Sequence, residues 1–379
     1  MSQKTKDIST DPSKSTLYGI VNSNRSADDL WGKNQFNSSF PASLACWMRD
    51  NKINPIYIET VKRNKEIKVE TTERLSWDDI FRTKKPNNEL TFCFEHPYEP
   101  YEKYIHIDEE RLENIDLVIA DYSNQDKPIY LRPLEVKLTV LPDSTTFKLE
   151  EKEWCSELVV RPASTSYAAL GIFNHIPEKE KNKARKIIEP ISIKVRDWSA
   201  HSAILQNKDG IINALDVFYA EFSKYQQPFL MQPIWKTSGV SPEFAEQAFD
   251  IFVWSDYSLC RTFIDTAKSE SKKTAKVSRS MRSCARLLRC LYELATTKKV
   301  LINRIYREMA LDNQTDKEFA LSGKKTISYM ACPRLLKPKL SKNVLTSIIL
   351  NGGENKLSPE RRFDASIFFT AKKLFEEKK

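Results

Sequence analysis

The apolar positions in the first 140 residues fall into short runs that are typical of β-strands. These runs cover 55–61, 66–70, 91–95, 117–121 and 129–140. A helix is predicted ahead of them over 41–51, because Pro41 suits a first helical turn and an apolar stripe follows that includes Ala45 and Met48. One helix followed by short strands predicts a mixed α/β core with hairpins.

Helical periodicity dominates from Ser164 onward. Ser241, Pro242 and Glu243 have the residue types of a helix start, with a cap residue, a first-turn proline and an acid near the positive end of the macrodipole. The same three types recur at 358–360, ahead of a segment that keeps one apolar face. The polar opening, rich in serine and asparagine, is expected to form a flexible arm. We therefore expect three parts: an arm at 1–26, an α/β core at 27–175 and a mainly helical part at 176–379 that packs on the core.

Two of the predicted strands carry the residues that suggest chemistry. The first, around 115–121, is apolar but contains Asp116, and the second contains Glu135 and Lys137. Side chains alternate across a strand, so Glu135 and Lys137 project from one face. A short polar turn joins the strands, which makes them hairpin neighbours and allows Asp116 to stand beside Glu135.

Two carboxylates and an ammonium in one patch suit metal-assisted hydrolysis of a phosphodiester. Mg²⁺ usually takes one or two carboxylates, with waters and phosphate oxygens completing an octahedron. Asp116, Glu135 and the main-chain carbonyl of Val136 would be the ligands, and Lys137 would hold or help to deprotonate the attacking water. The alternative is a solvated face with a cross-strand ion pair, worth only about 0.2 to 1 kcal/mol. The apolar residues on either side are too dense for an exposed edge strand.

The same residues resemble a known family. Asp116 with Glu135-Val136-Lys137 matches the PD-(D/E)xK nuclease motif, and the text L-E-V-K-L-T-V-L-P-D at 134–143 resembles the HindVP group of type II restriction endonucleases. The blocks W-G-K-N-Q-F-N-S-S-F-P-A-S-L-A-C-W-M-R-D at 31–50 and S-P-E-R-R-F-D at 358–364 are also similar to this group. The resemblance covers most of the chain. The three sequence blocks are more specific to this group than the short nuclease motif.

The resemblance implies a PD-(D/E)xK core, a mixed sheet flanked by helices, in a protein of the prokaryotic cytoplasm. It implies Mg²⁺-dependent cleavage of double-stranded DNA at a short palindrome of the GRCGYC type, by a homodimer. Asp116 and Glu135 would be the metal ligands and Lys137 the catalytic lysine. Many such nucleases add an acid from the first helix, and here only Asp50 is available, with Glu59 as a substitute; a surface ion pair is the alternative for both. Asp121 is a further candidate ligand, with turn capping as its alternative.

Charge points to an anionic partner. Sixty Lys and Arg against 51 Asp and Glu give a net charge of +9. Within the segment 268–307, arginines at helical spacing form one face of a predicted helix whose other face is apolar, and three lysines precede it. The candidate DNA-binding residues are Arg279, Arg282, Arg286, Arg289, Lys272, Lys273 and Lys276. The alternative is a solvated helix face that touches nothing.

Several function classes are disfavoured. The eight glycines fit neither G-x-G-x-x-G nor G-x-x-x-x-G-K-[ST], so no nucleotide cofactor is expected. The chain has no membrane-length apolar stretch, and a soluble, unexported protein is expected. The seven cysteines contain no C-x-x-C pair, and the four histidines lack ligand spacing, so both sets are expected to be structural or on the surface.

Two other functions remain open from the residues alone. One is a DNA-binding protein without catalysis, in which Glu135 and Lys137 merely pair. The other is a repair or recombination nuclease that uses the same core on a DNA structure instead of a sequence.

Overall fold

The structure is a computed structural model, in which only part of the chain is described. The described residues are 42, 45–46, 48–52, 56–60, 68–71, 76–106, 112, 114–123, 128–138, 157–160, 162–226, 229–230, 236–238, 241–243, 251–254, 256–269, 277–309 and 319–322. The predicted arm at 1–26 and the predicted helix start at 358–360 lie outside them, as do Lys272, Lys273 and Lys276.

The strands predicted in the first 140 residues are present. They are β1 (Ile56–Thr60), β2 (Lys68–Thr71), β3 (Thr91–His96), β4 (Ile115–Asp121) and β5 (Ile129–Leu138). Helical residues at 42, 45–46 and 48–50 agree with the helix predicted over 41–51, and Ala45 and Met48 of its apolar stripe are buried. β4 and β5 pair as neighbours across a short connection, which confirms the predicted hairpin.

Seven strands form the main sheet, in the order β2-β1-β7-β10-β5-β4-β3. β7 (Phe229–Leu230) and β10 (Ile251–Trp254) come from the part predicted to be mainly helical, so the sheet is not confined to 27–175. A mixed sheet was expected, but each ladder between the described strands of this sheet is antiparallel. The expectation is wrong for these strands because β7 and β10 enter between β1 and β5 and run against both neighbours.

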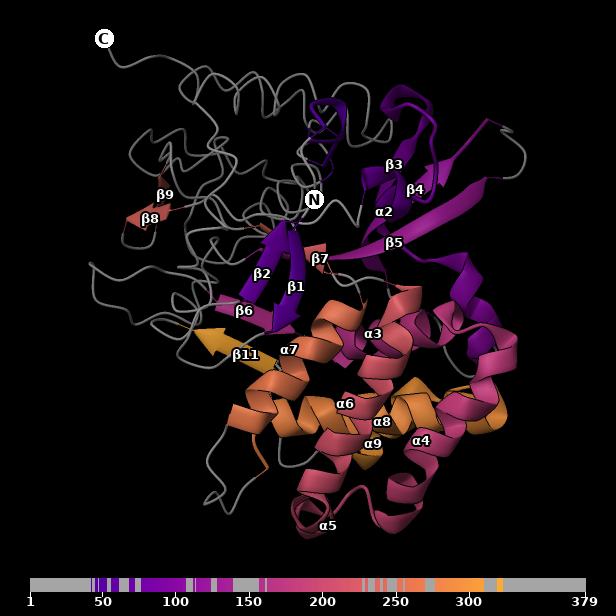
Figure 1. Cartoon of the computed structure of the whole chain (residues 1–379), viewed down its shortest axis with the longest axis vertical. Coiled ribbons are helices and arrows are strands. Elements are labelled where there is room, and N and C mark those ends of the chain that lie inside the picture. Colours follow the sequence, from indigo (N-terminus) through magenta and orange to yellow (C-terminus); the bar gives the residue numbers. More distant parts are fainter. Residues whose placement is uncertain are drawn as a thin grey trace, which may run out of the picture.

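The longer helices gather on one side of the sheet (Figure 1). They are α3 (Pro162–His175), α4 (Lys181–Lys194), α5 (His201–Gln206), α6 (Lys208–Phe222), α7 (Asp256–Ser269), α8 (Arg279–Thr297) and α9 (Ile302–Glu308). Short helix α2 (Trp77–Phe81) lies by the sheet, and 3-10 turns occur at η2 (Asn87–Glu89), η3 (Glu99–Tyr104), η4 (Glu178–Glu180) and η5 (Ser223–Tyr225). No helix in the described ranges is long and apolar enough to cross a membrane.

Two small sheets complete the described elements. β6 (Glu157–Val160) pairs with β11 (Phe319–Ser322), and β8 (Lys236–Ser238) pairs with β9 (Ser241–Glu243). The helix start predicted at Ser241-Pro242-Glu243 is therefore wrong, because these residues form β9. Thr237 faces Pro242 and Ser238 faces Ser241 across a tight hairpin, so pairing with β8 overrides the local capping signal.

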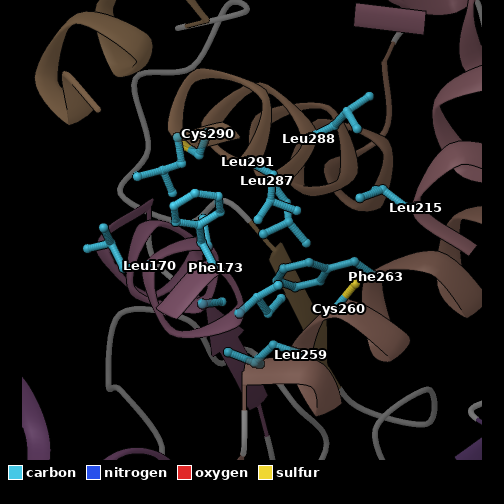
Figure 2. Packing of buried hydrophobic residues seen from close by; sticks show 14 of the residues in the cluster. Leu170, Phe173, Leu215, Leu259, Cys260, Phe263, Leu287, Leu288, Cys290 and Leu291 are labelled. Carbon is cyan, nitrogen blue, oxygen red and sulfur yellow. The ribbon is translucent and has the colours of Figure 1, made fainter. Parts of the chain in front are cut away.

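The core of the helical side is built around α8. The predicted apolar face of this helix is buried, including Met281, Cys284, Leu288 and Leu291. Figure 2 shows Leu287 and Leu291 of α8 facing Phe173 of α3 and Phe263 of α7. Five cysteines in the described part are buried and free of disulfides, as expected for core thiols.

Helices cover both faces of the sheet near β4. Phe81 of α2 makes an edge-to-face contact with Phe92 of β3, with ring centroids 5.8 Å apart. Val118 and Ala120 of β4 instead belong to the cluster that contains the α3, α7 and α8 side chains. Because strand side chains alternate, Asp116 shares its face of β4 with Val118 and Ala120. This places Asp116 on the face covered by the longer helices.

Candidate active site

The register of β4 and β5 brings Asp116 and Glu135 together. Leu117 pairs with Leu134 and Val118 with Pro133, so the same antiparallel register, continued by one residue, places Asp116 opposite Glu135. Residues directly opposite each other in an antiparallel pair have Cβ atoms about 4.5–5.5 Å apart and point to the same face. The sheet thus provides the juxtaposition of carboxylates on which the predicted metal site depends.

β5 is an interior strand at this position. On the side away from β4 it pairs with β10, where Trp254 faces Glu135 and Phe252 faces Lys137. The dense apolar sequence around Glu135 had indicated that β5 is not an exposed edge strand, and this pairing confirms it. Trp254 and β10 were not anticipated, because they come from a distant and mainly helical part of the chain.

Glu135 is buried, with 8% of its surface exposed. Its Oε1 accepts a hydrogen bond from Ser164 Oγ of α3 at 2.5 Å. A surface ion pair on a solvated face was the alternative interpretation of Glu135, and burial on an interior strand contradicts it. A carboxylate placed here needs compensating partners, because burying an ionised group without them costs several kcal/mol.

Lys137 and Val136 are described only by their backbones. Both lie in register with β10, Lys137 opposite Phe252 and Val136 opposite Val253. Their side chains lie outside the described part of the structure. The roles of the Lys137 ammonium and the Val136 carbonyl therefore stay predictions.

The further acids considered as ligands have other partners. Asp50 is exposed and accepts a hydrogen bond from Asn87 Nδ2 at 2.5 Å. Asp121 forms an ion pair with Lys85 at 2.5 Å and accepts hydrogen bonds from both the backbone and the hydroxyl of Ser123. Hydrogen bonds from Lys85 and then from Ser123 lower the pKa of Asp121 to about 2. These contacts confirm the turn-capping interpretation of Asp121, and the side chain of Glu59 lies outside the described residues.

A buried acid near β5 was missed by the sequence analysis. Asp256 begins α7, two residues after Trp254, and its Oδ2 accepts a hydrogen bond from Gln226 Nε2 at 2.8 Å. Burial raises the pKa of Asp256 to about 6, although Arg132 and Gln226 both act to lower it. Glu135 contributes a smaller increase in this pKa. The sequence around Asp256 shows only an acid at a helix start, which is usually exposed.

α3 approaches Asp256 closely because residue 171 is glycine. A Cβ atom built on Gly171 would clash with the Asp256 carboxylate. His175, one turn further along α3, lies 3.3 Å from Gln226 Nε2 through its Nδ1. The contacts of Asp256 thus tie α3, α7 and the end of η5 together beside β5.

The predicted DNA-binding face of α8 requires a correction. Arg279 is exposed, but Arg282 and Arg286 are each only 6% exposed. Arg286 donates to the Met309 carbonyl at 2.7 Å, and its guanidinium lies 5.0 Å from the centre of the Tyr306 ring. The expectation that all four arginines lie on the protein surface is therefore wrong for Arg282 and Arg286.

α9 covers part of the arginine side of α8. Arg304 of α9 forms an ion pair with Glu293 of α8 at 2.6 Å, and Arg289 of α8 reaches Glu293 at 3.6 Å. Arg289 also lies 3.9 Å from Glu308 of α9. The part of the α8 charged stripe around Arg286, Arg289 and Glu293 thus packs against α9.

The donor set beside Ser164 fits a hard cation. Asp116 and Glu135 offer carboxylate oxygens, and Mg²⁺ is commonly held by one or two carboxylates while it keeps several waters. Within the described ranges, no group of three or more His, Cys, Asp or Glu side chains could hold a metal ion. Two carboxylates are a donor set that Mg²⁺ can use when waters and substrate oxygens complete its coordination.

The similarity of this chain to known proteins extends far beyond the candidate site. The model of the HindVP restriction endonuclease family matches residues 31–375. This chain belongs to that family. The family membership agrees with the resemblance found in the motif and in its flanking blocks.

Two curated relatives of this HindVP family member span nearly the whole chain. A protein named type II restriction enzyme HgiDI, from Herpetosiphon aurantiacus, is 35% identical over 366 residues, which cover 95% of this chain and 97% of the relative. A protein named probable type II restriction enzyme HindVP, from Haemophilus influenzae, is 31% identical over 364 residues, covering 96% of this chain and 95% of the relative. No solved structure matches the chain.

Proposed function

We propose that this protein is a type II restriction endonuclease that hydrolyses phosphodiester bonds of double-stranded DNA at a short palindromic site. The observation that carries the proposal is the β4–β5 register, in which Leu117 pairs with Leu134, because one further step of this register sets Asp116 opposite Glu135. Family membership and the names of the relatives support it. Carboxylates placed side by side repel each other when both are ionised, and a divalent cation held between them relieves that repulsion.

In this proposal Asp116, Glu135 and the Val136 carbonyl hold Mg²⁺. When bound, Mg²⁺ supplies Lewis acid stabilisation of the charge on the phosphate and lowers the pKa of a coordinated water. Glu135 is held in place by Ser164 and by its interior strand. Lys137 follows two positions later on the same strand face, where an ammonium offsets the negative charge that develops on the reacting phosphate.

DNA would be held by basic residues outside the catalytic patch. Arg279 at the exposed start of α8 is the described candidate, and Lys272, Lys273 and Lys276 precede it in the chain. Arg289 is already engaged with Glu293, so its contribution to phosphate binding is expected to be smaller. A palindromic target, for which GRCGYC is the candidate, matches the two-fold symmetry of a homodimer.

Plasmid digestion tests the function directly. Wild-type protein with Mg²⁺ should yield discrete fragments whose ends map to one short palindrome, and chelation of the metal should abolish cutting. Asp116→Ala, Glu135→Ala and Lys137→Ala should each lower the cleavage rate by at least about 100-fold, because each removes a group from the reacting centre.

Asp121→Asn is the matched control, since it alters an acid on the same strand that is paired with Lys85. It should cut at a rate within a few-fold of wild type. Cleavage by Glu135→Ala at the wild-type rate would contradict the site assignment. Nicking that depends on DNA structure and not on sequence would support a repair nuclease instead.

A further inference from the structure

The hydroxyl of Ser164 forms a hydrogen bond with a side chain that is distant in the sequence. Serine in the first turn of a helix commonly bonds to its own backbone. Ser164 instead donates to Glu135 Oε1, a residue 29 positions earlier in the chain, at 2.5 Å. Both residues are buried, with exposures of 5% for Ser164 and 8% for Glu135. A buried hydrogen bond to a carboxylate is among the stronger side-chain contacts.

α3 is held firmly in the position that this contact requires. Ser164 and Gly171 are seven residues apart and so lie on the same side of the helix. A Cβ atom on Gly171 would clash with the Asp256 carboxylate, so there is no room for a side chain between α3 and Asp256. The start of α3 is thus fixed against β5, and the Asp256 contact fixes its middle.

We propose that Ser164 is a positioning residue that sets the Glu135 carboxylate for metal binding. This inference rests on the proposed function, because it assigns a role to Ser164 within the same site. The hydroxyl engages Oε1 and so restricts rotation of the carboxylate.

The physical effect is on the affinity for metal and not on the chemical step. A glutamate side chain has three rotatable bonds, and the freedom lost on coordination must be offset by the binding energy. Hydrogen bonds to ligating carboxylates reduce this cost, and removing such partners typically lowers metal affinity or activity about 10- to 100-fold. Ser164→Ala should therefore weaken metal binding about 10-fold.

Direct binding of Mn²⁺ to the full chain in the absence of DNA tests this role. The signal of free Mn²⁺ in electron paramagnetic resonance gives the dissociation constant without reference to activity. Ser164→Ala should raise this constant about 10-fold, and Glu135→Ala should remove the site. Ser164→Thr, which keeps the hydroxyl, should restore most of the affinity. In cleavage assays, Ser164→Ala should raise the half-saturating Mg²⁺ concentration while the rate at saturating Mg²⁺ stays within a few-fold of wild type.

Ser166→Ala is the matched control. Ser166 is buried in the same helix, but its hydroxyl shares a hydrogen bond with the Tyr306 hydroxyl at 2.6 Å and not with Glu135. Mn²⁺ affinity should therefore stay within about twofold of wild type in this variant. Wild-type affinity in Ser164→Ala, or equal losses in the Ser164 and Ser166 variants, would overturn the positioning role while leaving the metal site in place. Unchanged Mn²⁺ binding in Glu135→Ala would overturn the proposed site itself, and the role of Ser164 with it.

Discussion

The pKa of the Asp256 carboxyl group differs between the folded and the unfolded chain. Its ordinary pKa of 3.8 rises to about 6 because burial disfavours the charged carboxylate. Between these two values the unfolded chain has released its proton while the folded chain still holds it. Rising pH in this range therefore favours unfolding, and the stability contributed by the protonated group is lost as pH passes about 6.

The free energy of unfolding should therefore fall measurably as the pH rises. From pH 5 to pH 7.5, ionisation of Asp256 should lower the free energy of unfolding by about 1.4 kcal/mol, the equivalent of one pKa unit. Asp256→Asn cannot ionise and should lack this component. Urea unfolding at both pH values should show the difference between wild type and variant changing by that amount.

Asp121→Asn provides the comparison for this experiment. The pKa of Asp121 is lowered to about 2, chiefly by Lys85, so it stays charged in the folded and the unfolded chain from pH 5 to pH 7.5. The stability difference between wild type and Asp121→Asn should be constant over that range. A change as large as that for Asp256→Asn would contradict the assignment of the effect to Asp256.

At the level of single residues, the candidate carboxylates could be predicted from the sequence, but the residues that surround them could not. Asp116 and Glu135 stand out because acids interrupt apolar strands. Ser164 and Asp256 do not stand out, because serine and aspartate are common near helix starts. Their relation to Glu135 arises only where α3 and α7 pack beside β5.

Among the elements, α3 shows how one missing side chain sets a packing distance. Gly171→Ala would place a methyl group against the Asp256 carboxylate, which Gln226 holds by a hydrogen bond. The variant should lose about 1–3 kcal/mol of unfolding free energy, as expected for overpacking. Urea or thermal unfolding would measure the loss.

Gly210→Ala in α6 is the matched helical substitution. The added methyl group would meet only the end of the Ile191 side chain, which borders an open pocket between α4 and α6 and can move. Because alanine favours the helix by about 1 kcal/mol over glycine, this variant should be near wild type or more stable. Equal destabilisation of the two variants would show that the Asp256 contact is not responsible.

α8 shows the limit of reasoning from one helix. Its periodicity correctly predicted a buried apolar face with Met281 and Leu288. The same periodicity suggested that the arginine face is open to solvent, but α9 contacts Arg286 and Arg289 on that face. Arginine is suited to such burial because its planar guanidinium bonds carbonyls and stacks on aromatic rings.

Across the whole molecule, positive charge is concentrated toward the carboxyl end. Residues 266–379 contain 26 Lys and Arg against 11 Asp and Glu, a net charge of +15, while the preceding residues carry a net charge of −6. The candidate catalytic acids lie in the acidic part. This distribution suits a protein that separates metal binding from phosphate binding.

Substitution of Arg279 is expected to affect DNA binding, whereas substitution of Arg286 is expected to affect stability. Arg279→Ala should weaken DNA binding and reduce the slope of log affinity against log salt by about 1, with little effect on stability. Arg286→Ala should lower the free energy of unfolding by about 1–3 kcal/mol, because it removes a buried hydrogen bond to the Met309 carbonyl. DNA binding at several salt concentrations, together with urea unfolding, distinguishes the two. A reduced salt slope in the folded Arg286 variant, with unchanged stability, would contradict this division.

The sequence by itself determined the strands before residue 140, the β4–β5 hairpin, the apolar face of α8 and the family. These features depend on local periodicity or on motifs whose residues are contiguous in the chain. Tertiary structure alone decided that β10 flanks Glu135, that Ser164 donates a hydrogen bond to it and that α9 contacts Arg286 and Arg289 of α8. Such contacts join segments that are distant in sequence, and their energy comes from burial and pairing that no local pattern records.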